Sequence, residues 1–154
     1  MNPILHVIVG GLGTLGFNIL FHLRGKKLWL ATLGGIISWA VYLLLEPLHS
    51  GEAVRYLFAA AAITVYGEVL ARIVKTPTTT FLVPACIPLI PGGALYYTMN
   101  YALNKQWVEF LHQAFYTVQL AFSIAAGIIA VTTVVRLATA LKQRAKNTQP
   151  QSVK

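Results

Sequence analysis

A short apolar segment of the sequence is interrupted by three prolines and two glycines. Pro84, Pro88 and Pro91 follow one another at spacings of four and three, and Gly92 and Gly93 come directly after the last proline. A proline inside a helix removes a backbone hydrogen bond and clashes with the preceding turn, at a cost of about 3 kcal/mol. The pattern therefore predicts a broken helix, with a new half-helix beginning at Pro91.

This break has the composition of an anion-binding site. The first N–H groups of a helix lack partners within the helix, and the helix dipole favours negative charge there. Gly92 and Gly93 would leave these amides unshielded, so we expect them to hold a substrate carboxylate. In a bilayer, broken backbone survives where it is buried in protein or lines a cavity, as at transporter substrate sites. The residues of the expected site, in which two tyrosines shape or gate the pocket, are Pro88, Pro91, Gly92, Gly93, Tyr96 and Tyr97. The alternative is a kinked structural helix without a ligand.

Glu68 is the only acidic residue that the sequence places within an apolar span. An ionisable group at that depth is costly and indicates a function by default. Arg72 follows four residues later and therefore lies on the same helical face. Two interpretations stay open: a coupling site that binds a proton or a substrate ammonium group, or a structural pair between the two side chains.

The composition identifies the class of protein that carries these residues. Of 154 residues, 56% are hydrophobic and 10% are charged, with four glutamates, no aspartate, and twelve Lys and Arg for a net charge of +8. A soluble domain has about 25% charged residues, and disorder requires low hydrophobicity. The chain is therefore expected to be an all-α, polytopic membrane protein.

Five apolar stretches predict five transmembrane helices, of which the fourth is broken by proline and glycine. They cover residues 3–23, 28–45, 54–74, 78–103 and 112–135. Each is close to the length of about 20 residues that a span requires. We expect one transmembrane domain over residues 1–141, followed by a cytoplasmic polar tail over 142–154 that is disordered.

The basic residues predict the orientation of these helices. Ten of the twelve lie at alternate helix ends, in 24–27, 72–75 and from 136 onward. By the positive-inside rule, the N-terminus is outside and the C-terminus is cytoplasmic, in the cell's inner (plasma) membrane. The charge is thus a topology signal, and no nucleic-acid partner is expected. Tryptophans and tyrosines near the span ends are expected to form an interfacial belt; they include Trp39, Tyr42, Tyr56 and Tyr116.

Other motifs point to packing rather than chemistry. Gly11, Gly13 and Gly16 spell GxGxxG, but inside a predicted span and without an acidic residue near position 36, so a dinucleotide site is rejected. Small residues there and on other spans predict close helix packing, and an oligomer with itself or with another chain. With no HExxH, P-loop or carboxylate pair, and one cysteine, Cys86, we expect no enzyme, cofactor or metal site.

Three stretches resemble the small membrane component of the threonine/serine exporter (ThrE) family. They are residues 16–22, residues 68–77, and residues 83–92 with Tyr96 and Met99 downstream. The third stretch is the most specific, because it resembles the P-x-x-P-G core of the family. The likeness covers about residues 10–140.

The resemblance implies a subunit of a secondary exporter that works with a larger ThrE-family membrane partner. The implied substrates are threonine and serine, or dicarboxylates such as succinate, and transport would be coupled to the proton motive force. All of these substrates carry a carboxylate, in agreement with the half-helix argument. The alternative is a membrane scaffold that stabilises a partner transporter without transporting anything itself.

Overall fold

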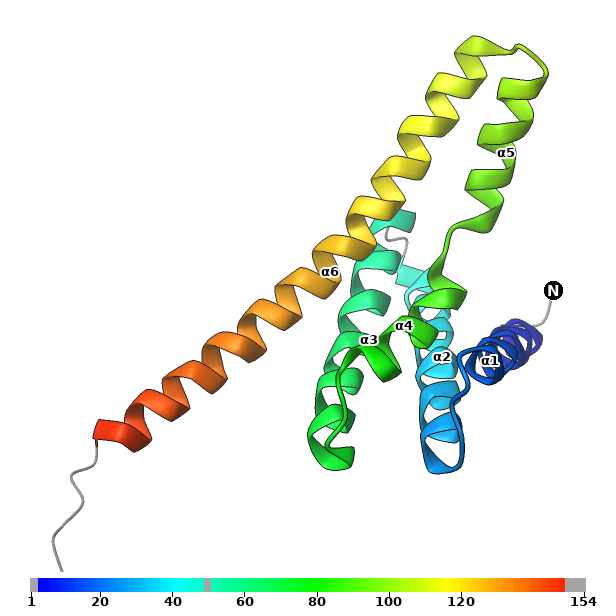
Figure 1. The fold of residues 1–154 in the computed structure, drawn as a ribbon. Helices are drawn as coiled ribbons and strands as arrows, with labels where there is room; N and C mark the ends of the chain where they lie inside the picture. Colours follow the sequence, from blue (N-terminus) through cyan, green and yellow to red (C-terminus); the bar gives the residue numbers. More distant parts are fainter. Residues whose placement is uncertain (1–2, 49–50, 149–154) are drawn as a thin grey trace, which may run out of the picture.

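The computed structural model describes residues 3–48 and 51–148, and these residues form helices and turns without strands (Figure 1). The α-helices are α1 Pro3–Leu20, α2 Lys26–Leu44, α3 Glu52–Val74, α4 Thr79–Cys86, α5 Gly92–Leu103 and α6 Trp107–Thr148. Two short 3-10 turns, η1 Glu46–Leu48 and η2 Ile87–Leu89, follow α2 and α4. The all-α class predicted from the composition is confirmed.

The helices form a body of α1 to α4, from which a hairpin of α5 and α6 projects (Figure 1). α2 packs against α1, α3 and α4, and α6 packs along α3. The main buried core joins α3, α4, η2 and α6; it contains Tyr56, Ala59, Ala60, Ile63, Ala85, Leu89 and Leu120. α5 packs mainly against α6, so the segment after the break is held by one neighbouring helix.

Small residues allow the closest helix crossings, as the sequence predicted. A Cβ added at Gly35 would clash with the Thr14 side chain of α1. One added at Gly127 of α6 would clash with the backbone carbonyl oxygen of Leu57 in α3. Glycine is therefore required at both crossings. By contrast, a Cβ at Gly13 would meet nothing within 4 Å, so packing does not explain that glycine.

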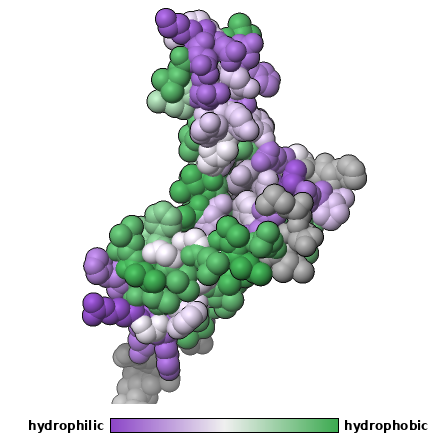
Figure 2. All heavy atoms as spheres, turned by 90° about the vertical axis from the view of Figure 1, so that its right-hand side faces the viewer, coloured by the Kyte–Doolittle hydropathy of each residue, from purple (hydrophilic) through white to green (hydrophobic). Residues whose placement is uncertain are grey.

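Within the part of the chain that the structure describes, three helices are long and apolar enough to cross a membrane: α2, α3 and the Trp107–Lys142 part of α6. The fourth predicted span is indeed broken, because Thr79–Leu89 and Gly92–Leu103 meet at 56° and qualify only as a bent pair. The apolar part of α1, Leu5–Leu20, is shorter. Length and composition thus support three or four spans, and a fifth would require α1. Figure 2 shows hydrophobic side chains over much of the body below mid-height, with hydrophilic side chains at the hairpin tip, at mid-height and at the opposite end.

α6 is much longer than the fifth predicted span. It contains 42 residues, which at 1.5 Å per residue is about 63 Å, twice the thickness of a hydrocarbon core. The helix continues across the predicted domain boundary at residue 142 to Thr148, where lysine, arginine, glutamine and alanine favour helix without needing burial. The rest of the predicted tail, residues 149–154, lies outside the described residues.

The basic segments gather at one end of the body. α2 begins, and α3 and α6 end, toward the same lower side of Figure 1. Lys26 opens α2, Lys75 caps α3, and Lys142 and Arg144 lie in the last turns of α6. This grouping agrees with the alternation on which the predicted orientation rests.

Candidate functional site

The break lies between η2 and α5 and leaves helix-start amides open. Ile90 is extended, Pro91 is the N-cap, and α5 begins at Gly92. The Gly92 N–H donates to the Ile90 carbonyl at 2.7 Å, and the Leu95 N–H donates to Pro91 at 3.0 Å. The Gly92 amide, expected to bind a carboxylate, is therefore already occupied. The next two amides, of Gly93 and the residue after it, have no acceptor within the helix.

Neither glycine is required by the fold itself. Neither has a left-handed φ, and a Cβ at Gly92 or Gly93 would meet nothing within 4 Å. The space beside the break is therefore open, and a larger side chain there would affect what enters this space rather than the packing of the chain.

The break opens into a cavity of about 410 Å³ between α2, α3, α5 and α6. This volume lies within the usual range of small-molecule sites. The cavity is lined by Trp39, Glu52, Tyr56, Ile90, Pro91, Gly92, Gly93, Ala94, Tyr97, Gln113, Tyr116 and Leu120. The structure thus brings Pro91, Gly92, Gly93 and Tyr97 together. Pro88 lies in η2 outside the lining, and Tyr96 packs edge-on against Tyr97, with ring centroids 5.5 Å apart.

Glu52 carries the charge in this cavity. It is the first residue of α3, and its side chain is half-buried. The Tyr42 hydroxyl donates to Glu52 Oε1 at 3.1 Å, and the Tyr116 hydroxyl donates to Oε2. Two helices therefore fix the carboxylate. The sequence patterns did not indicate Glu52 as a site residue.

The aromatic residues around Glu52 form a wall. Trp39 stacks on Tyr42 at 5.0 Å between centroids and 6° between planes, and Tyr42 contacts Tyr56 at 5.0 Å. Trp39, Tyr56 and Tyr116 line the cavity. These three side chains line the cavity at span ends, where the sequence predicts an interfacial belt; the belt itself stays a prediction.

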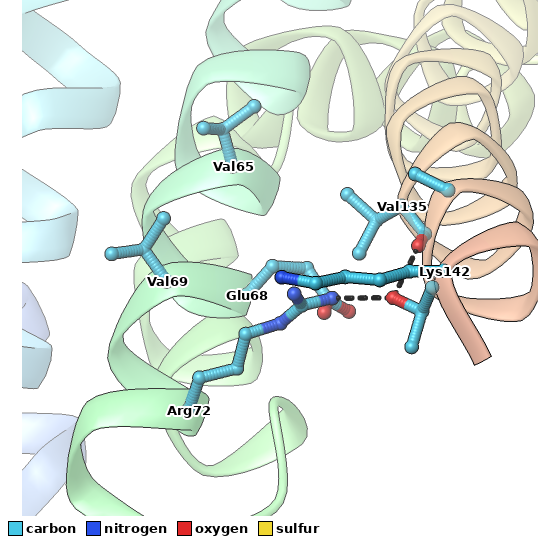
Figure 3. Close-up of a pocket in the computed structure, with 8 residues that line it drawn as sticks. Val65, Glu68, Val69, Arg72, Val135 and Lys142 are labelled. Atoms are coloured by element: carbon cyan, nitrogen blue, oxygen red, sulfur yellow. Dashed lines mark hydrogen bonds between the residues drawn. The ribbon is translucent and has the colours of Figure 1, made fainter. Parts of the chain in front are cut away.

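A second pocket, of about 280 Å³, lies between α3 and α6 near the basic end and contains the other predicted residues (Figure 3). Glu68, Arg72 and Lys142 line it together with valine, alanine and threonine side chains. Thr78 Oγ1 donates to Glu68 Oε1 at 3.2 Å, and Arg72 Nη2 donates to Thr139 Oγ1 at 3.0 Å. Glu68 and Arg72 therefore share a pocket, and each has a threonine partner.

A model of the family described as Threonine/Serine exporter, ThrE, matches residues 6–134, which is most of the chain. The chain belongs to the threonine/serine exporter family. No curated protein and no solved structure matches it. The matched range includes every residue of the break cavity, whereas the second pocket also uses residues beyond it.

In this member of the threonine/serine exporter family, the predicted residues at the break and the predicted pair Glu68 and Arg72 lie in separate pockets. Glu52 and Glu68 are sixteen positions apart on α3, which corresponds to about 24 Å along the helix axis. A small molecule in the break cavity beside Glu52 therefore cannot reach Glu68. The sequence signal that could have indicated Glu52 is the scarcity of acids, since each of only four glutamates is conspicuous in an apolar chain.

Asn18 makes a polar contact between α1 and α2. Asn18 of α1 is fully buried, and its Nδ2 donates to Thr32 Oγ1 of α2 at 2.9 Å. It is a helix–helix contact, which is the role that polar residues most often have in membrane helices. Among residues 3–48 and 51–148, no group of three or more potential metal ligands is present.

Proposed function

We propose that this chain is the small membrane subunit of a secondary exporter of small carboxylate-bearing metabolites. The family description supports threonine and serine as substrates; dicarboxylates such as succinate are the second candidate class. A larger ThrE-family membrane subunit completes the transporter. The complex lies in the inner membrane, with the N-terminus of this chain outside and its C-terminus cytoplasmic.

The observation that carries the proposal is the cavity into which the helix break opens. The amides of Gly93 and Ala94 lie in the first turn of α5, and both residues line the cavity. Helix-start amides attract carboxylates, and discontinuous helices are a recurrent substrate site in secondary transporters. Alternating access would then move the α5 half of the broken helix relative to α3.

The proposal can be tested in inside-out membrane vesicles from cells that express the complete transporter. Uptake of labelled threonine and succinate reports export activity. A Gly92→Leu side chain would project into the open space at the break, so uptake of the transported substrate should fall about tenfold or more. Gly13→Leu is the matched control, since a Cβ at Gly13 also meets nothing within 4 Å. Unchanged uptake with Gly92→Leu, at equal protein level, would remove the break from the mechanism.

Glu68 and Arg72 remain our candidates for coupling to the proton gradient. Glu68 is half-buried, and both residues line the pocket near the basic end of the body. We expect Glu68→Gln vesicles to lose the acceleration of uptake that an acidic lumen gives, while threonine binding persists. Glu109→Gln, at an exposed site of α6, is the control. A normal response of Glu68→Gln to the gradient would exclude Glu68 from coupling.

The alternative function is a scaffold for the partner transporter, and the exposure of α6 favours it. Only 11% of the most apolar window of α6 is buried within the chain, against 33% for α3. A scaffold predicts that Pro88→Ala combined with Pro91→Ala leaves assembly and transport intact. A transporting subunit predicts normal assembly with loss of uptake, because a straightened helix closes the break.

A further inference from the structure

We propose that Glu52 binds the protonated amino group of the substrate, so that the cavity at the break selects zwitterionic amino acids over dicarboxylates. The inference rests on the proposed function, because it assumes that the substrate carboxylate occupies the start of α5. It assigns a binding role to a residue outside the break itself.

The carboxylate of Glu52 is held in place and retains capacity to accept hydrogen bonds. Each oxygen accepts one tyrosine hydroxyl, from Tyr42 and Tyr116. An ionised carboxylate has about four lone-pair sites, so about two remain for an ammonium group. No ion pair within 4.0 Å satisfies Glu52 among the described residues, although the Arg55 guanidinium lies 5.3 Å from the Tyr42 ring centroid.

The walls of the cavity suit a cation as well. Trp39, Tyr56, Tyr97 and Tyr116 line it beside Glu52. Aromatic faces attract ammonium groups through the ring quadrupole, and the attraction is greatest where the cation is desolvated. A carboxylate among aromatic rings is therefore an environment for a primary ammonium group rather than for a second anion.

The cavity lining offers two kinds of polar group, helix-start amides and a carboxylate, and an amino acid matches both. Helix-start amides lie at Gly93, and Glu52 is the one charged side chain among the described lining residues. A dicarboxylate would bring two negative charges into a site that already holds one. A zwitterion places its carboxylate at the amides and its ammonium at Glu52, so like charges remain apart.

The test compares threonine and succinate in the same inside-out vesicles, with Glu52→Gln as the variant. We expect wild-type vesicles to take up threonine in preference to succinate. Loss of the charge at Glu52 should lower kcat/KM for threonine by roughly 10- to 100-fold, chiefly through KM, and leave succinate uptake unchanged or raised. Glu109→Gln removes one negative charge from an exposed site and should leave the uptake of both substrates unchanged.

The outcomes separate this inference from the proposed function. The inference is overturned if the wild type takes up succinate in preference to threonine. It is also overturned if Glu52→Gln changes the uptake of both substrates equally, or changes the uptake of neither. In each case the proposed carboxylate exporter still stands. Absence of uptake of either substrate by the wild type overturns the proposed function and the inference together. The proposed function and the inference are both supported if Gly92→Leu abolishes uptake of threonine and of succinate while Glu52→Gln lowers uptake of threonine alone.

A competition experiment needs no variant and so holds even where Glu52→Gln fails to accumulate. Serine and glycerate differ in that glycerate has a hydroxyl where serine has its ammonium group. We expect serine to inhibit threonine uptake by the wild-type transporter about tenfold or more better than glycerate. Equal inhibition by the two compounds would overturn the role of Glu52.

Discussion

Replacing Gly127 by alanine should push α3 and α6 apart at their closest crossing. An added Cβ would lie 3.1 Å from Ala60 Cβ and from the Ala61 amide nitrogen, and closer still to the carbonyl oxygen of Leu57. Two of these three atoms belong to the backbone of α3, so no side-chain rotation relieves the contact. The helices would have to separate by about 1 Å to restore ordinary van der Waals distances.

The size of the effect follows from two opposing terms. Overpacking of this kind costs about 1–3 kcal/mol of folding free energy. The cost of Gly127→Ala lies toward the upper end of that range, because two of the contacts are with backbone atoms of Leu57 and Ala61. Alanine in place of glycine within a helix stabilises by about 1 kcal/mol. The net destabilisation is therefore about 1–2 kcal/mol, which for a chain of this length lowers Tm by about 2–8 °C.

The measurement is the thermal transition of the purified protein in detergent, followed as loss of the monodisperse peak in size-exclusion chromatography. Gly13→Ala is the matched control, because it receives the same gain in helix propensity and meets no neighbouring atom within 4 Å. Its Tm should stay the same or rise slightly. A Gly127→Ala protein as stable as Gly13→Ala would refute the close α3–α6 crossing.

Three further predictions concern other contacts. Asn18→Leu should change the free energy of unfolding by less than about 1 kcal/mol, measured by the same assay, since Thr32 Oγ1 keeps its own 2.9 Å bond to the Leu28 carbonyl. Tyr116→Phe should raise the KM for threonine several-fold in vesicle uptake and leave kcat nearly unchanged, because Glu52 keeps its charge but loses one of two restraints. A fluorescent protein that matures only in the cytoplasm should be bright when fused after residue 154, since the basic end of α6 is predicted to be cytoplasmic.

The helix break could be predicted because its cause is local. Proline and glycine act on the turn in which they occur, so Pro88, Pro91, Gly92 and Gly93 indicate a bend regardless of tertiary context. The exact occupancy of the amides could not be predicted in the same way. The Gly92 N–H bonds to the Ile90 carbonyl through an extended residue, a geometry that depends on how η2 and α5 meet.

The Glu52 site could not be predicted from the sequence because it depends on contacts between distant segments. Glu52 and Tyr116 are 64 positions apart, and hydropathy places both at span ends, where an aromatic belt is the usual interpretation. The same limit applies to α6. Its apolar residues mark where a membrane could lie, but helix propensity continues the helix beyond them in both directions.

The crossing at Gly127 lies between the two cavities along α3 and α6. On α3, Leu57 to Ala61 meet Gly127 between Glu52 on one side and Glu68 on the other, and α6 passes α3 diagonally (Figure 1). One cavity lies on each side of this contact, each formed in part by α3 and α6. In secondary transporters, alternating access is largely a rocking of one helix group against another, and under the proposed mechanism this contact would be the pivot. On this reasoning Gly127→Ala should slow uptake of every substrate alike, whereas Glu52→Gln should discriminate between them; a substrate-selective effect of Gly127→Ala would rule out the crossing as the pivot.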